Sequence, residues 1–150
     1  YTNTLTVLRV TGSVLRRAME RSAEYFAVDE EGRLCVADAF LKPKVEHYNY
    51  DYFSGVNYAF DVSRPEGQRV VELTYQGKAV KDEDEFTICL NSYRASGAGG
   101  YPEYTQCQVV REINIEMSDL ILDFFKNTPK VSLKTHRWFS VYTSPGIGAL

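Results

Sequence analysis

The sequence predicts an α+β fold in a single domain, built from a mixed or antiparallel sheet with flanking helices. Two segments, near residues 14–26 and 117–125, carry apolar residues at helical spacing. Between them lie short apolar runs separated by turn signals such as Arg64-Pro65-Glu66-Gly67. Strands in hairpin order between helices favour α+β over a doubly wound parallel sheet. The length of 150 residues suits one domain, 1–150, with a buried core.

Each element follows from a local pattern. Ser13 is expected to cap the first helix and Ser118 the second, because hydroxyl side chains accept hydrogen bonds from free amides at a helix start. Phe86–Leu90 is expected to be a short central strand, with Cys89 as a buried thiol. The other expected strands are 4–10, 55–62, 70–75 and 138–142, and 29–52 is expected to be a loop with short helical turns. The predicted core contains Leu15, Met19, Phe26, Val71, Phe86, Ile88, Leu120 and Phe124.

Composition and counting exclude several classes of function. The formal charge of −3 gives no basic surface for duplex nucleic acid, although a small nucleotide needs only a pocket. No apolar run approaches the length of a membrane span. Three cysteines without CxxC spacing predict neither a disulfide framework nor a zinc site. His47 and His136 belong to no metal-binding motif, and we expect surface or hydrogen-bonding roles for them and no catalytic centre in this chain.

A glycine-rich segment follows the strand at 86–90. It begins at Asn91-Ser92-Tyr93-Arg94 and continues through Ala95-Ser96-Gly97-Ala98-Gly99-Gly100-Tyr101. It lacks the Lys-Ser/Thr of a P-loop and the GxGxxG register of a dinucleotide fold. A flexible loop is one interpretation. A binding loop is the other, because loops at strand ends present ligand groups and a tyrosine beside glycine amides offers a stacking face.

The second candidate segment is Tyr48-Asn49-Tyr50-Asp51-Tyr52-Phe53-Ser54-Gly55. In a strand, Tyr48, Tyr50 and Tyr52 would share one face. Three phenols are costly in a dry core because each hydroxyl needs a hydrogen-bond partner. A half-exposed aromatic wall is therefore preferred over core packing.

Three motifs together resemble the C-terminal domain of the 5′-nucleotidase family. They are Thr11-Gly12-Ser13-Val14-Leu15, then Tyr48-Asn49-Tyr50-Asp51 with Ser54-Gly55 and Asp61, then Asn91-Ser92-Tyr93-Arg94-Ala95-Ser96-Gly97. Their order and spacing match over roughly residues 3–131. The resemblance implies the fold of that domain. It also implies that the reaction occurs in a separate N-terminal metallophosphoesterase domain, which holds a pair of divalent metal ions, while this chain holds no cofactor.

The resemblance further implies a site for a nucleotide or nucleoside in which two aromatic rings sandwich the base. By position, these rings are Tyr50 and Tyr93, with Tyr48 the less favoured candidate for the first ring. The remaining expected substrate contacts are Asn91, Arg94, Ser96, Gly97 and Gly99, with Asp51 as an additional candidate.

One departure from the family pattern indicates a branch. Many members have an Asp in the third motif where this sequence has Gly99. Tyr93-Arg94-Ala95, in place of the Phe-x-Ala of many members, resembles the third motif of the 2′,3′-cyclic-nucleotide 2′-phosphodiesterase/3′-nucleotidase branch. Absence of that carboxylate would remove repulsion from a cyclic phosphate diester. The expected parent is thus a nucleotide hydrolase, of that branch or a 5′-nucleotidase.

The chain lacks the family's metal-ligand motifs and its Asn-Gly-Gly-Gly-x-Arg motif. We therefore expect a domain truncated on its N-terminal side that is inactive alone, from a parent that is secreted, periplasmic or attached to the cell wall. Two interpretations from other classes remain open. One is a cell-surface binding or adhesion module whose aromatic wall recognises a sugar or a protein, and the other is a structural domain with packed tyrosines.

Overall fold

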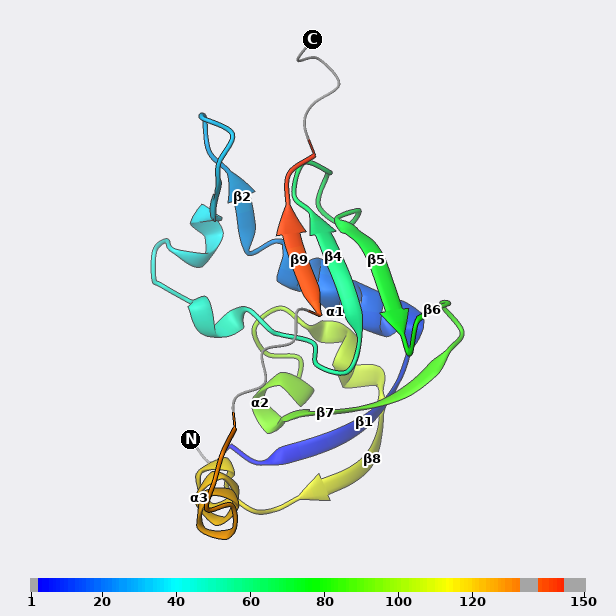
Figure 1. Cartoon of the computed structure of the whole chain (residues 1–150), viewed down its shortest axis with the longest axis vertical. Helices are drawn as coiled ribbons and strands as arrows, with labels where there is room; N and C mark the ends of the chain where they lie inside the picture. Colours follow the sequence, from blue (N-terminus) through cyan, green and yellow to red (C-terminus); the bar gives the residue numbers. More distant parts are fainter. Residues whose placement is uncertain (1–2, 133–137, 145–150) are drawn as a thin grey trace. The chain divides into compact units, whose positions relative to one another are not determined.

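The computed structural model describes residues 3–132 and 138–144, and the mixed helices and strands confirm the α+β class (Figure 1). The chain forms two compact units, each of which combines segments distant in sequence. The first, here called the three-stranded unit, comprises Tyr1–Thr11 and Asp84–His136. The second, the four-stranded unit, comprises Gly12–Glu83 and Arg137–Leu150.

The three-stranded unit has β1 at the centre of its sheet (Figure 1). Its strands are β1 (Leu5–Thr11), β7 (Glu85–Asn91) and β8 (Gln108–Ile113), in the order β7-β1-β8. Both neighbours run antiparallel to β1, and Leu8 lies opposite Ile88 in β7. Thr6, Leu8 and Val10 alternate along β1 and are buried, so this face of the strand contributes to the core.

The prediction that the segment 86–90 forms a central strand is wrong. Within the described residues β7 pairs only with β1. Phe86, Ile88 and Leu90 are half-buried, whereas Thr87 and Cys89 point to the opposite face and are exposed. The expected burial of Cys89 is therefore wrong as well, because the pleat of the strand directs it away from Ile88.

The described part of this unit also contains the helical segments α2 (Ser92–Ala95), η3 (Pro102–Gln106) and α3 (Met117–Asn127). Ser118 is not the cap of α3, because Glu116 precedes the helix and Ser118 lies within its first turn. Phe124 is 53% exposed, which contradicts its predicted place in the core. The apolar side of α3 instead lines a small hollow of about 230 Å³ together with Leu5.

The four-stranded unit contains a sheet in the order β6-β5-β4-β9. Its strands are β4 (Asn57–Asp61), β5 (Val70–Tyr75), β6 (Lys78–Ala79) and β9 (Phe139–Tyr142). The pairs β4–β5 and β5–β6 are antiparallel hairpins, whereas β9 pairs in parallel with β4. Tyr58, Phe60 and Leu73 are the large buried side chains of this sheet.

Helix α1 (Gly12–Ala23) lies against β5 (Figure 1). Leu15 and Met19 are buried, as predicted. The carboxylate of Glu20 accepts hydrogen bonds from the backbone amides of Arg69 (3.0 Å) and Val70 (2.8 Å), which fixes the start of β5 on the helix. These hydrogen bonds connect a polar side chain of the helix to backbone amides at the start of the strand. Without Glu20, those amides would need another acceptor.

The start of α1 differs from the prediction. The helix begins at Gly12, and Ser13 lies inside it and donates its backbone N–H to the carbonyl of Asp82 at 3.1 Å. Ser13 is therefore not the cap. A Cβ at position 12 would collide with the carbonyl oxygen of Lys81, so this close approach of the two backbones requires glycine.

The region 29–52 contains more structure than its irregular pattern indicates. A hairpin of β2 (Phe26–Val28) and β3 (Leu34–Val36) is followed by η1 (Asp38–Phe40) and η2 (His47–Asn49). The helix α1 ends at Ala23, so Phe26 belongs to β2 and is half-buried. The expected helical turns are confirmed, and the hairpin was missed.

Candidate functional site

Tyr93 lies in α2, directly after the end of β7. Its side chain is 42% exposed. The side-chain oxygen of Asn91 accepts a hydrogen bond from the backbone N–H of Arg94 at 2.7 Å and so caps this short helix. The local sequence Asn-Ser-Tyr-Arg thus has a clear structural role, because an asparagine N-cap starts a helical turn that presents Tyr93 at the surface.

Arg94 points in the other direction and is only 3% exposed. Its Nη1 donates to the carbonyl of Ala98 at 2.5 Å. Its guanidinium carbon lies 4.1 Å from the ring centre of Tyr101 and 5.6 Å from that of Tyr93. Both distances are within the range of cation–π contacts. The guanidinium is therefore part of the interior of the loop.

The glycine-rich loop is an ordered turn. The backbone N–H of Gly97 donates to the carbonyl of Arg94 at 2.9 Å, and that of Tyr101 donates to Gly97 at 3.1 Å. Gly97, Gly99 and Gly100 all have positive φ, between 77° and 92°, which favours glycine. The hydroxyl of Ser96 donates to the carbonyl of Tyr93 at 2.7 Å. Internal hydrogen bonds therefore shape the loop around Tyr93.

The aromatic segment is not a strand, and the expected single face of tyrosines is wrong. Tyr48 lies in η2, and the residues after it are irregular. Tyr48 is 55% exposed and Tyr52 is 64% exposed, whereas Tyr50 is half-buried. Asp51 is also half-buried. The segment is thus partly exposed and partly packed.

The ring of Tyr50 is packed among other aromatic rings. Its centre lies 4.8 Å from that of Tyr25, 5.0 Å from that of Tyr52 and 5.4 Å from that of Phe26. The hydroxyl of Tyr25 shares a hydrogen bond of 2.7 Å with Nδ1 of His47, which ties η2 to this cluster. Tyr48 instead has the ammonium group of Lys44 over its ring at 5.7 Å.

The structure brings the residues of the glycine-rich loop together around Tyr93. Tyr50 packs between Tyr25 and Tyr52, whereas Tyr48 lies beside Lys44. The two groups belong to different units. A common site made by Tyr50 and Tyr93 therefore stays a prediction.

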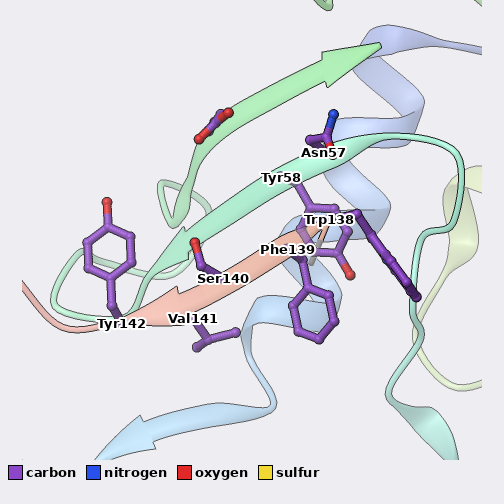
Figure 2. Close-up of a pocket in the computed structure, with 8 residues that line it drawn as sticks. Asn57, Tyr58, Trp138, Phe139, Ser140, Val141 and Tyr142 are labelled. Carbon is purple, nitrogen blue, oxygen red and sulfur yellow. The ribbon is translucent and has the colours of Figure 1, made fainter. Parts of the chain in front are cut away.

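A separate hollow of about 590 Å³ lies along β4 and β9 (Figure 2). Figure 2 shows Ser140 and Tyr142 on one side of β9 and Phe139 and Val141 on the other. Phe139 stacks on Tyr58 with ring centres 5.4 Å apart. Burial raises the pKa of the Tyr58 hydroxyl. None of the predicted site residues lines this hollow.

Asp61 belongs to the second of the three sequence motifs, and its contacts indicate a structural role. It is 3% exposed, and its carboxylate accepts hydrogen bonds from the hydroxyls of Ser63 and Ser144, each at 2.6 Å. The backbone amides of the same two serines also donate to it. The hydrogen bonds from Ser144 and Ser63 hold the pKa of this carboxyl well below its usual range.

Residues 3–132 and 138–144 contain no group of three or more His, Cys, Asp or Glu side chains that could hold a metal ion. No helix in this described part is long and apolar enough to cross a bilayer. Of the two histidines, His47 bonds Tyr25, and His136 lies outside the described residues.

The sequence prediction included Tyr101 only as the end of the glycine-rich segment, and it missed Tyr104 and the packing of the two rings. Both are buried, and their rings are stacked 5.9 Å apart with an interplanar angle of 4°. The signal that could have found them is the repeated Tyr in Tyr101-Pro102-Glu103-Tyr104, because residues three apart share one face of a helical turn.

Comparison with known proteins gives consistent results. The family model of the 5′-nucleotidase C-terminal domain matches residues 1–106. A 2′,3′-cyclic-nucleotide 2′-phosphodiesterase/3′-nucleotidase of Haemophilus influenzae is 34% identical over 85% of this chain and 21% of its own length. The trifunctional nucleotide phosphoesterase protein YfkN of Bacillus subtilis is 29% identical over 94% of this chain and 10% of its own.

Solved structures show the same similarity. A Staphylococcus aureus protein assigned provisionally as a 5′-nucleotidase, solved in complex with alpha-ketoglutarate, superposes with a TM-score of 0.89. It is 42% identical and matches over 95% of this chain and 28% of its own length. The chain thus spans less than a third of each of these three proteins.

Proposed function

Because the chain belongs to the family of 5′-nucleotidase C-terminal domains, we propose that it recognises the base of a nucleotide on behalf of a larger hydrolase. The observation that carries this proposal is the exposed ring of Tyr93, held at the surface by the Asn91 cap and the glycine-rich loop. Stacking on such a ring contributes roughly 1–3 kcal/mol per base and tolerates any base.

The first ring of the proposed sandwich comes from the segment 48–52, and Tyr93 is the second. The sequence favoured Tyr50, whose ring is packed against Tyr25, Phe26 and Tyr52. Tyr48 is 55% exposed, with the ammonium group of Lys44 over its ring, whereas Tyr50 is half-buried. This burial supports Tyr48 as the first ring and Tyr50 as the ring that supports the segment. In a nucleoside complex, the stacking rings should lie about 7 Å apart, which is twice a normal aromatic contact.

In the parent protein, two metal ions of the N-terminal domain would activate a water molecule that attacks the phosphate ester. This chain would supply the position of the base, and that domain of the same polypeptide would be its partner. The names of the Haemophilus influenzae and Bacillus subtilis relatives support a nucleotide phosphoesterase. Gly99, in place of the carboxylate of many members, supports the 2′,3′-cyclic branch. We also propose export of the parent, which fractionation of the native organism would test.

The proposal is tested in the full-length protein with single alanine substitutions of Tyr48, Tyr50 and Tyr93. The matched substrates are 2′,3′-cyclic AMP, which has a base, and bis-p-nitrophenyl phosphate, which does not. The substitution of Tyr93 should raise KM only for the nucleotide. So should the substitution of whichever of Tyr48 and Tyr50 forms the first ring. An unchanged KM for all three variants would exclude base recognition by these tyrosines.

A further inference from the structure

A row of four side chains runs inward from Tyr93 within the three-stranded unit. The guanidinium of Arg94 lies over the rings of both Tyr93 and Tyr101, at 5.6 and 4.1 Å. Tyr101 in turn stacks on Tyr104. Arg94 and Tyr104 are each 3% exposed and Tyr101 is fully buried, whereas Tyr93 is 42% exposed. The row thus connects the proposed stacking ring to the interior of its unit.

Arg94 is held in this row from two sides. Its backbone N–H donates to the side chain of Asn91 at 2.7 Å, and its Nη1 donates to the carbonyl of Ala98 at 2.5 Å. A planar guanidinium can stack on a ring and donate in its own plane at the same time, whereas an ammonium group is a point charge without a stacking face. The position therefore needs arginine specifically, and lysine is not an equivalent replacement.

We propose that Arg94 is a positioning residue that acts through Tyr93 and does not contact the phosphate. This inference rests on the proposed function and refines the sequence prediction, which placed Arg94 among the substrate contacts. A phosphate ligand needs guanidinium N–H groups that reach the site, but this side chain is almost entirely buried and turned toward Ala98 and Tyr101. Its contact fixes the rotamer of Tyr93 and the path of the loop behind it.

The two roles predict different binding patterns. A positioning residue affects adenosine and adenosine 3′-monophosphate by the same factor, because both carry the base. A phosphate contact affects only the nucleotide, and lysine would largely replace arginine there, since lysine also binds phosphate as a point charge.

The experiment measures the affinity of the full-length protein for adenosine and for adenosine 3′-monophosphate by calorimetry, with EDTA present so that the nucleotide is not hydrolysed. Arg94→Met and Arg94→Lys should each weaken both ligands by the same factor, about 5- to 10-fold. The double variant Tyr93→Ala/Arg94→Met should bind no more weakly than Tyr93→Ala alone, because the two substitutions remove the same interaction with the base. Arg17→Met, on the exposed face of α1, is the matched control and should change neither affinity.

The outcomes separate the two proposals. If Tyr93→Ala leaves adenosine binding unchanged, the proposed function fails. If Tyr93→Ala weakens binding but Arg94→Met affects only the nucleotide, or its effect adds fully to that of Tyr93→Ala, the positioning role is overturned. Should Arg94→Met fail to fold, Arg94→Lys still decides, because it keeps the charge and most of the stem. Full affinity of the lysine variant for both ligands would overturn the inference.

Discussion

The carboxylate of Asp61 and the hydroxyl of Ser144 lie 2.6 Å apart although 83 positions separate them in sequence. Asp61 is the last residue of β4, and Ser144 follows β9, which pairs in parallel with β4. A parallel pair has no tight turn to join its strands, so its register depends on contacts such as this one. The two hydrogen bonds from Ser144 therefore hold the end of β9 against β4. The two from Ser63 are local and satisfy the rest of the carboxylate.

Asp61→Asn should destabilise the four-stranded unit by about 2 kcal/mol, because hydrogen bonds to a buried carboxylate are stronger than those to an amide. Urea unfolding at pH 7 measures the change. Asp38→Asn is the control, since Asp38 is exposed and forms a surface ion pair with Lys42. Equal effects of the two substitutions would contradict a special role for Asp61.

Lowering the pH should reduce the stability that Asp61 contributes relative to asparagine. The folded-state pKa of Asp61 lies below its ordinary value of 3.8, with the hydrogen bond from Ser144 as the main cause. Stability from such a group is fully present above the unfolded pKa and is lost as the pH falls toward the folded pKa. The difference in unfolding free energy between the wild type and Asp61→Asn should thus shrink from pH 7 to pH 3. A difference that is constant with pH would show that the charge of Asp61 does not contribute.

Much of the fold was predictable because its signals are local. The strand at 70–75 has the predicted bounds, and the helices at 12–23 and 117–127 follow from apolar residues at helical spacing. The cap positions were wrong because a serine near a helix start cannot show by itself whether a neighbouring backbone already satisfies the first amides, as Asp82 does for Ser13.

Burial was less predictable than element type. Phe124 and Cys89 are apolar and lie in regular elements, yet both are exposed, because the face that meets the core depends on which other elements are present. The same limit applies to the candidate site. The sequence placed Tyr93 in a loop directly after a strand, and its role in a site stays a prediction. The burial of Arg94 depends on Tyr101 and the packing of Tyr50 on Tyr25, and neither residue belongs to the three motifs.

Gly97→Ala should distort the glycine-rich loop more than a positive φ alone explains. Gly97 has φ of +82°, and a Cβ there would lie 2.7 Å from Cγ2 of Thr105. Gly67 has φ of +80° and open space around it, so Gly67→Ala measures the cost of the backbone conformation alone, about 1–2 kcal/mol. We expect Gly97→Ala to cost about 1–3 kcal/mol more.

Thr105→Ser provides the rescue for this prediction. Serine lacks Cγ2 but keeps the hydroxyl, which in Thr105 donates to the carbonyl of Pro102 at 2.7 Å. The double variant Gly97→Ala/Thr105→Ser should recover most of the additional loss, as measured by thermal unfolding. No recovery would place the clash elsewhere in the loop.

The isolated chain should not hydrolyse 2′,3′-cyclic AMP or bis-p-nitrophenyl phosphate at any concentration of Mn²⁺ or Zn²⁺. The resemblance assigns the metal pair to a separate domain, and the part of the chain that the structure describes contains no metal-binding group. Metal-dependent release of p-nitrophenol by the purified chain, absent from a mock purification, would contradict the assignment of hydrolysis to a separate domain.

Recognition of the base by Tyr93 is tested most directly by the ratio of KM values in the full-length protein. Tyr93→Ala should raise KM for 2′,3′-cyclic AMP by about 10-fold or more, which corresponds to a stacking loss of roughly 1–3 kcal/mol. KM for bis-p-nitrophenyl phosphate should stay within about twofold of the wild type, because this diester has no base to stack. Equal losses on both substrates would mean that Tyr93 supports the loop or the fold and does not bind the base.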